Sequence, residues 1–319
     1  MSSLNTNVAA MTALMTLQNT QSALETTQSR VSTGFRVAEA SDNAAYWSIA
    51  TTMRSDNKAL ATVQDALGLG QAKVDVAYTG LNAAIDVVDQ IKTKLVAARE
   101  PGVDRSKIQS EIKALQEQLT SVAESSSFSG ENWLKIDGAA DAKAEIVASF
   151  DRSGGSVSVS TVEIEIGKTA LFNAGAGTGL LEGEITLAST DNDTGATAFT
   201  VTVSTLDVTK AGTQSGAPNG DVAASDADID AMISGVETAL QGMTSAAASL
   251  GASKARIDIQ SDFVGSLLGA IERGVSTLVD ADMTAESTKL SALQTQQQLG
   301  IQALSIANGN AQSILGLFR

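Results

Sequence analysis

A seven-residue repeat of apolar side chains is the feature of this sequence that most restricts its fold. From residue 49 to residue 95 apolar residues recur every seven positions, and a second apolar set fills most of the complementary positions. A period of seven keeps one helix face against a partner helix, so a repeat of about fifty residues predicts a helical seam on the order of 75–80 Å long. We predict a helix core at Met53, Leu60, Leu67, Val74, Leu81, Val88 and Leu95.

Two further segments repeat this pattern. A short one follows the helix-breaking sequence Glu100-Pro101-Gly102, and a long one alternates steps of four and three from residue 229 to residue 278. A short turn between two apolar-striped helices predicts that they are antiparallel neighbours. The long repeat must also bury its apolar face against another helix. The predicted core residues in these segments are Ile112, Leu119, Leu240, Leu250, Leu268 and Ile271.

The middle of the chain has a different periodicity. Between residues 138 and 221, apolar residues alternate with Ser, Thr and Glu, as at Val157 and Val159 or at Val162 and Ile164. A period of two predicts half-buried β-strands. Phe128, Trp133 and Leu134 precede this region in a turn-rich segment that we interpret as a strand or a hairpin with these three residues as buried anchors.

The predicted fold class is therefore α+β and mainly α. We expect a long antiparallel coiled-coil rod formed by the N- and C-terminal halves, with a small β-rich outer domain inserted in the middle. The expected divisions are an N-terminal assembly helix and linker at 1–42, two rod helices and a hairpin at 43–137, a variable β-rich domain at 138–221, a rod helix at 222–283 and a C-terminal assembly helix at 284–319.

Both ends of the chain are amphipathic but carry almost no charge. No charged side chain occurs before Glu25 or between Leu290 and Phe318. Such helices either belong to an ordinary globular core or pack against each other and against copies of themselves. We favour the second interpretation, with subunit packing at Leu4, Val8, Met11, Met15, Leu17, Leu24, Val31, Leu290, Leu293, Ile301, Leu304, Ala311, Leu315 and Phe318.

Composition argues against several classes of function. The chain has no His and no Cys, and its net charge is −15. These properties disfavour an enzyme, a metal or cofactor site and a nucleic-acid partner. The spacing of Asp226, Asp228, Asp230 and Glu237 approximates a calcium loop, but Ala231 stands where that loop needs glycine. No apolar run is long enough for a transmembrane helix, and no cleaved signal peptide is visible.

Motifs near both ends of the chain resemble bacterial flagellin, of the α-proteobacterial type. At the N-terminal end they are Leu4-Asn5-Thr6-Asn7, the segment RVSTGFRV at 30–37 and ASDNAA at 40–45. At the C-terminal end they are QLGIQAL at 298–304, Ala307-Asn308 and QSIL at 312–315. The resemblance covers about 1–137 and 222–319, and Phe128–Leu134 resembles the hairpin that follows the third flagellin helix.

The resemblance implies a structural subunit that is not an enzyme and that polymerises into the flagellar filament for swimming motility. An alternative with similar ends is the hook–filament junction protein. The resemblance also implies an extracellular location reached without a cleaved signal peptide, with terminal helices that become ordered on assembly. The implied partners are other copies of the chain, related flagellins, the filament cap, the hook–filament junction proteins and an export chaperone that binds the C-terminal segment, without insertion into a membrane.

Two departures from the family pattern affect these expectations. Tyr46-Trp47 stands where many flagellins have small or aliphatic residues, which favours the α-proteobacterial type. The segment VDQIKTKL at 88–95 matches poorly the arginine-rich segment through which other flagellins bind Toll-like receptor 5. The sequence therefore argues against recognition by that receptor. Two further alternatives are an enzyme domain in the middle of the chain and a secreted coiled-coil adhesin.

Overall fold

The computed structural model describes residues 7–153, 156–187, 200–210 and 224–316, with only the backbone described for Ser153 and for 310–316. The chain divides into two compact units. The terminal unit comprises residues 1–59 and 267–319, and the central unit comprises residues 60–266. Two long helices contribute to both units: α2 (Ala44–Ala98) and α4 (Asp226–Val279).

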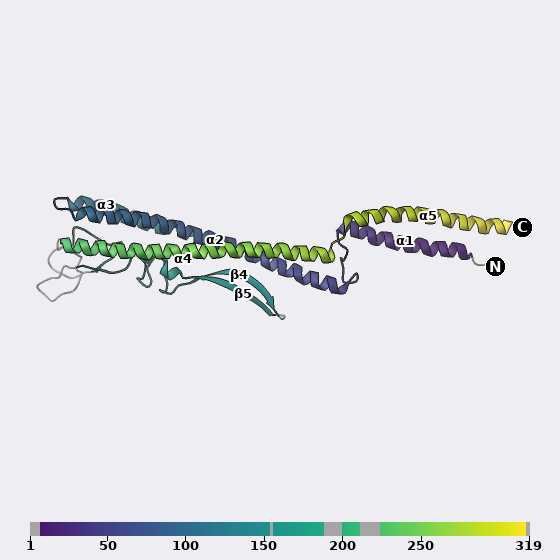
Figure 1. Cartoon of the computed structure of the whole chain (residues 1–319), viewed down its shortest axis with the longest axis horizontal. Coiled ribbons are helices and arrows are strands. Elements are labelled where there is room, and N and C mark those ends of the chain that lie inside the picture. Colours follow the sequence, from purple (N-terminus) through teal and green to yellow (C-terminus); the bar gives the residue numbers. More distant parts are fainter. Residues whose placement is uncertain (1–6, 154–155, 188–199, 211–223, 317–319) are drawn as a thin grey trace. The chain divides into compact units, whose positions relative to one another are not determined.

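In the central unit α2 and α4 are antiparallel neighbours in a constant register (Figure 1). Gln71 Nε2 donates to Asp258 Oδ1 at 2.6 Å, and four residues later Asp75 pairs with Lys254 at 2.5 Å. Further along, Lys92 pairs with Glu237, and Arg99 pairs with Asp230 at 2.9 Å. Each step forward on α2 is thus matched by an equal step backward on α4. This is the geometry of an antiparallel coiled coil.

The ion pairs lower the pKa of the glutamate and raise the pKa values of the lysines, so each shift favours the charged form. The hydrogen bond from Lys92 lowers the pKa of Glu237, with a smaller Coulomb contribution from the same ammonium. The hydrogen bond to Glu237 in turn raises the pKa of Lys92, and the one to Asp75 raises that of Lys254. All these side chains remain partly exposed, so the pairs define the register more than they stabilise the unit.

The apolar seam between these helices forms the core of the central unit. Helix α3 (Arg105–Ser125) is antiparallel to α2, because Lys94 pairs with Glu111 at 2.6 Å while Arg105 Nε donates to the Ala98 carbonyl. At about 1.5–3 kcal/mol for each aliphatic side chain removed from water, the seam is the main source of stability. The buried residues are Leu60, Leu67, Val74, Leu81, Val88, Leu95, Ile112, Leu119, Ile229, Val236, Met243, Leu250, Ile257 and Val264.

The predicted core residues differ in their degree of burial. Of those in α2, α3 and α4, Met53, Leu240, Leu268 and Ile271 are only partly buried, and the others are buried. Met53 and Ile271 lie in the terminal unit, where both pack against a small cluster made of Val37, Ala50, Val275 and Val279.

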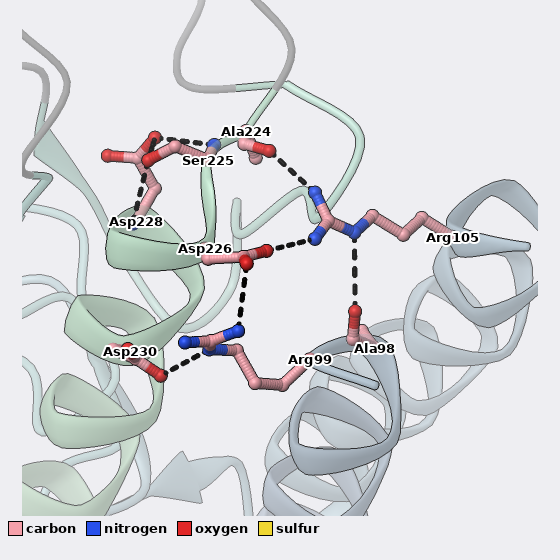
Figure 2. A network of polar contacts seen from close by, with 8 residues as sticks. All are labelled: Ala98, Arg99, Arg105, Ala224, Ser225, Asp226, Asp228 and Asp230. Carbon is pink, nitrogen blue, oxygen red and sulfur yellow. Dashed lines mark hydrogen bonds and ion pairs between the residues drawn. The ribbon is translucent and has the colours of Figure 1, made fainter. Parts of the chain in front are cut away.

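A polar network joins the three helix ends of the central unit (Figure 2). The Arg105 guanidinium donates to the carbonyls of Ala98 and Ala224 and to the Asp226 carboxylate, at 3.2, 2.6 and 2.6 Å. Arg99 lies between Asp226 and Asp230, at 2.9 Å from each. Of the four acidic residues that approximate a calcium loop in the sequence, Asp226 and Asp230 therefore bind arginine side chains. Asp228 accepts from Ser225, and Glu237 pairs with Lys92.

Helix ends in the structure follow local capping chemistry. Ser225 and Asp228 form a capping box at the start of α4, in which the Asp228 carboxylate accepts from the Ser225 amide and hydroxyl. At the start of α2, Asn43 Oδ1 accepts the hydrogen bonds from the amides of Ala45 and Tyr46. The Asp42 carboxylate instead accepts from the amides of Ala38 and Glu39.

A tight hairpin follows α3, as the sequence predicts. Strands β1 (Ser127–Phe128) and β2 (Glu131–Asn132) are antiparallel. The two turn residues, Ser129 and Gly130, both have positive φ, at 52° and 86°. Positive φ at both central positions is typical of a type I′ hairpin turn. Trp133 and Leu134 are buried, and Phe128 is partly buried.

The middle of the chain contributes one long hairpin and several short strands to the central unit. The hairpin pairs β4 (Ala144–Ser153) with β5 (Ser156–Ile164). Strand β3 (Lys135–Ile136) pairs in parallel with β6 (Phe172–Asn173), β7 (Ile185–Thr186) pairs with β8 (Thr200–Val201), and a 3-10 turn occupies Ile166–Lys168.

The expected half-burial of the strands holds for only part of the long hairpin. Val162 and Ile164 are buried, whereas Val157 and Val159 are more than half exposed. The inner half of the hairpin packs on the helices, since Ile146 lies against Gly70 of α2 and the Gln260 amide of α4 donates to the Ala148 carbonyl. The outer half contains only exposed or partly exposed β5 residues, so its apolar alternation does not correspond to a buried face.

Candidate assembly interface

The terminal unit contains the two nearly uncharged helices, α1 (Val8–Thr33) and α5 (Met283–Gly316). They lie side by side and antiparallel (Figure 1). Asn7 caps α1 by accepting from the Ala10 amide, and its own amide donates to the Ala307 carbonyl of α5 at 3.0 Å. At the opposite end of the pair, Arg30 Nη1 lies 3.3 Å from Glu286 Oε1.

One face of each helix is turned toward the other helix. On α1 this inner face contains Thr20 and Thr27, which are buried, and the predicted packing residues Leu17, Leu24 and Val31, which are partly buried. On α5 partly buried residues recur at steps of four and three, and they include the predicted residues Leu290, Leu293 and Leu304. Leu17 lies against Gly300 of α5, where an added Cβ would come within 3.2 Å of its side chain.

In its first two turns, the opposite face of α1 is apolar and uncovered. At about 100° of rotation per residue, Val8, Met11 and Met15 fall on one stripe, roughly opposite the stripe of Leu17, Leu24 and Val31. These three side chains are 67%, 63% and 66% exposed. The predicted α1 packing residues therefore divide into two groups, one turned to α5 and one turned away from it.

Helix α5 also has large apolar side chains that its partner helix does not cover. The predicted residue Ile301 is 54% exposed, and Leu299 and Ile306 are 60% and 65% exposed. Leu299, Ile306 and the exposed Leu14 of α1 are absent from our sequence-based set. The spacing of seven between Leu299 and Ile306 is the signal that could have identified that pair.

Four predicted packing residues lie at the limits of the described structure. Leu4 and Phe318 are outside the described residues. Ala311 and Leu315 belong to the helical backbone of α5, but their side chains are outside the described part.

A short backbone junction fixes the ends of α1 and α4 within the terminal unit. Gly34 ends α1 in the left-handed conformation, with φ of 76°, as is typical of helix C-termini. Beyond it, the amides of Arg36 and Val37 donate to the Val279 carbonyl at 2.7 and 3.2 Å, and the Ala281 amide donates back to the Gly34 carbonyl at 2.9 Å. The segment RVSTGFRV therefore contains a helix end, a turn and a two-way backbone connection.

Aromatic and charged side chains cover this junction. The Arg54 guanidinium carbon lies 4.7 Å from the centre of the Phe35 ring, which is the geometry of a cation–π contact. The side-chain amide of Asn57 on α2 donates to the backbone carbonyl of Leu268 on α4, at 3.4 Å. These contacts connect the start of α2 to the end of α4 and to the linker that leads to α1.

The arrangement is suited to association between protein chains. The terminal unit exposes aliphatic and thioether side chains on α1 and α5, and exposed apolar patches of this kind mark interaction surfaces. Among the helices that the structure describes, none combines the length and the hydropathy needed to cross a membrane.

Comparisons with known proteins agree with this description. The model of the bacterial flagellin N-terminal helical region matches residues 4–138, and the model of the bacterial flagellin C-terminal helical region matches residues 233–318. The chain is 46% identical to Flagellin A of Rhizobium meliloti over an aligned length of 396 residues, and 49% identical to Flagellin C of Rhizobium meliloti (strain 1021) over 336. It is 45% identical to a flagellin of Brucella melitensis over 320. Each of these alignments covers 100% of both chains.

Proposed function

Because the chain belongs to the bacterial flagellin family, we propose that it assembles into the flagellar filament through the outer faces of α1 and α5. Flagellins are structural subunits of the extracellular filament used for swimming, so the established part of this function is polymerisation and not catalysis. The observation that carries the proposal is the exposure of Val8, Met11 and Met15 on a helix that has no charged side chain before Glu25 and whose other face already has a partner. No observation favours the hook–filament junction alternative.

The weak burial within the α1–α5 pair supports a surface completed by neighbouring subunits. In α1 only Thr20 and Thr27 are buried, and none of the described side chains of α5 is buried. Ordering a residue costs about 1–2 kcal/mol, which so little burial does not offset. We therefore propose that both helices gain most of their stability when neighbouring subunits cover the exposed residues. In this view the inner residues Leu17, Leu24 and Val31 hold the pair together, while the outer residues join subunits.

We propose the same division of roles for the rest of the chain. The seam residues from Leu60 to Leu95 and their partners on α4 would form a preassembled rod, because they are already buried within one chain. The region 138–221 would be the outward-facing variable part. The exposed apolar side chains of α5, such as Leu299 and Ile306, would also suit an export chaperone, with export proceeding without a cleaved signal peptide. Related flagellins, the filament cap and the hook–filament junction proteins remain proposed partners.

We also propose that Toll-like receptor 5 recognises this chain poorly, because of the state of the segment 88–95. In the segment 88–95, Val88, Ile91 and Leu95 are fully buried. The two cations of the segment are engaged with neighbouring helices, Lys92 with Glu237 and Lys94 with Glu111. A receptor that binds a basic helix face would have to compete with Glu237 and Glu111 for these two lysines.

Seeded polymerisation of a truncated chain tests the proposal. Removal of residues 304–319 takes away the last part of α5 and leaves the central unit complete. We expect a folded, soluble protein with the helical circular dichroism of the central unit but no elongation of filament seeds. The full-length chain should elongate the same seeds. Normal filaments from the truncated chain would refute the role of α5.

A further inference from the structure

Methionine is the only sulfur-containing residue in this chain, which has seven methionines and no cysteine. Their environments differ sharply. Met232 and Met243 are fully buried in the central unit, and Met53 is partly buried. Met283 is 43% exposed, whereas Met11 and Met15 are 63% and 66% exposed. Among the described methionines, the two on α1 are therefore the most accessible to a soluble oxidant.

Met11 and Met15 also lie on the outer face of α1. They are four residues apart, so consecutive helical turns place both side chains on one stripe beside Val8. The inner face of α1, with Thr20 and Thr27, is turned to α5 and does not shield them. Two thioethers thus lie within the surface that we propose for subunit packing.

The chemistry of this surface can be changed by a peroxide. The thioether sulfur attacks one peroxide oxygen, the O–O bond breaks, and an S–O bond forms, so that sulfur is oxidised by two electrons and the peroxide leaves as water or alcohol. The product, methionine sulfoxide, is polar where the thioether was apolar, and reductases can reverse the reaction. A sulfoxide oxygen buried in an apolar interface without a donor is unfavourable.

We propose that Met11 and Met15 form an oxidation-sensitive site that controls whether a free subunit can be added to a filament. This inference rests on the proposed packing role of the outer face of α1. Peroxide converts the pair to sulfoxides in the free subunit and blocks addition. Assembly covers the pair, so subunits already in the filament are protected.

The test compares free subunits and filaments treated with hydrogen peroxide. Peptide mass spectrometry should find sulfoxide at Met11 and Met15 in free subunits well before Met232 and Met243 are modified. Addition of the oxidised subunits to untreated seeds should be slower by about tenfold, equivalent to about 1.4 kcal/mol. Reductases specific for the two sulfoxide epimers should restore elongation of the same sample.

Variants separate this pair from Met283, the other exposed methionine among the described residues. The double variant Met11→Leu, Met15→Leu keeps the apolar face and should elongate seeds at the same rate before and after peroxide. The matched control Met283→Leu should remain as sensitive as the unmodified chain. Equal inactivation of the double variant, normal elongation by subunits fully oxidised at both positions, or equal oxidation of the pair in filaments and free subunits would each overturn the proposal.

These outcomes are distinguishable from a failure of the packing proposal itself. If the outer face of α1 takes no part in assembly, a charged substitution there leaves elongation unchanged without any oxidant. If the face is an interface but sulfoxides are tolerated, the charged substitution blocks elongation while peroxide does not.

Discussion

Arg30 and Glu286 are 256 positions apart in the sequence, yet Nη1 of the arginine lies 3.3 Å from Oε1 of the glutamate. The pair connects α1 to the start of α5, and the glutamate side chain is only 13% exposed. It is an ion pair between two helices that carry few other charged side chains. We infer that it fixes the axial position of α1 against α5 while the apolar inner faces supply the burial.

Loss of this ion pair should loosen the pairing of the terminal helices. The Glu286→Gln variant removes the charge and keeps the size, and a partly exposed pair contributes up to about 1 kcal/mol. We expect filaments of this variant to dissociate at a lower temperature, measured by light scattering during heating. The exchanged double variant, Arg30→Glu with Glu286→Arg, should recover part of the loss. Unchanged dissociation in the Gln variant would show that the pair does not contribute.

A charge on the outer face of either terminal helix should prevent assembly. Met11→Glu and Ile301→Glu each place a carboxylate at a position that is more than half exposed in the single chain, so neither should unfold it. In a packed interface an unpaired carboxylate is strongly unfavourable. We expect no elongation of seeds, followed by sedimentation or electron microscopy.

Val157→Glu is the matched control for these variants. Val157 is 53% exposed on the outer half of the β4–β5 hairpin, so the substitution has the same chemistry at similar exposure. It should elongate seeds normally. If it blocks elongation as strongly as Met11→Glu, the terminal faces have no special role.

The helices and their core were predictable because a regular heptad repeat records which side is buried. Leu67, Val74 and Leu81 lie where the repeat places them, all fully buried. The repeat could not show which apolar stripe of α1 is turned to α5. Leu17 and Met15 have similar hydropathy, and only the position of the partner helix separates a partly covered side chain from an exposed one.

The periodicity of the sequence could not predict which distant segments contact one another. The heptad repeat does not indicate that Gly70 of α2 makes space for Ile146 of β4. Asp226 and Asp230 approximate part of a calcium loop in the sequence, but in the structure their arginine partners come from the end of α2 and the start of α3. Val157 and Val159 alternate like buried strand residues, although both side chains are more than half exposed in the structure.

The ion pairs of the central unit should make its stability depend on pH at both extremes. The pKa of Glu237 is lowered below its ordinary 4.5, so its contribution is present above pH 4.5 and is lost as the pH falls through the lowered pKa. The pKa values of Lys92 and Lys254 are raised above 10.5, so their contributions are present below pH 10.5 and are lost as the pH rises through the raised values.

Thermal unfolding as a function of pH measures this effect. We expect a plateau between about pH 4.5 and pH 10.5, with declines on both sides that become smaller at high salt. The Glu237→Gln variant should flatten part of the acid decline, because its side chain no longer titrates. An acid decline identical to that of the unmodified chain would exclude a contribution from this pair.

Arg105 should be difficult to replace, even by another cation. Its guanidinium donates to two carbonyls and one carboxylate that belong to two separate segments, the end of α2 and the start of α4. Removal in Arg105→Ala leaves these acceptors without that donor, and we expect a loss of about 1–3 kcal/mol in the free energy of unfolding of the central unit.

The conservative variant Arg105→Lys tests whether geometry or charge matters. A single ammonium cannot span the three acceptors as the planar guanidinium does, so the lysine should recover little of the loss. Chemical denaturation monitored by circular dichroism compares the three proteins. Full recovery by lysine would mean that only the charge is needed there.

Two glycines of α2, two residues apart, should respond oppositely to the same substitution. An added Cβ at Gly68 meets no atom within 4 Å, whereas at Gly70 it would lie 2.5 Å from Cγ2 and 2.7 Å from Cδ1 of Ile146. Alanine is favoured over glycine within a helix by up to about 1 kcal/mol, so Gly68→Ala should raise the melting temperature. Gly70→Ala has the same helical gain, but its overpacking against a buried branched side chain should cost about 1–3 kcal/mol and lower the melting temperature.

The paired variant Gly70→Ala, Ile146→Val should recover part of that loss, because it removes the Cδ1 that the new methyl group would contact. A Gly70→Ala protein as stable as Gly68→Ala would mean that β4 does not rest on α2 at this position.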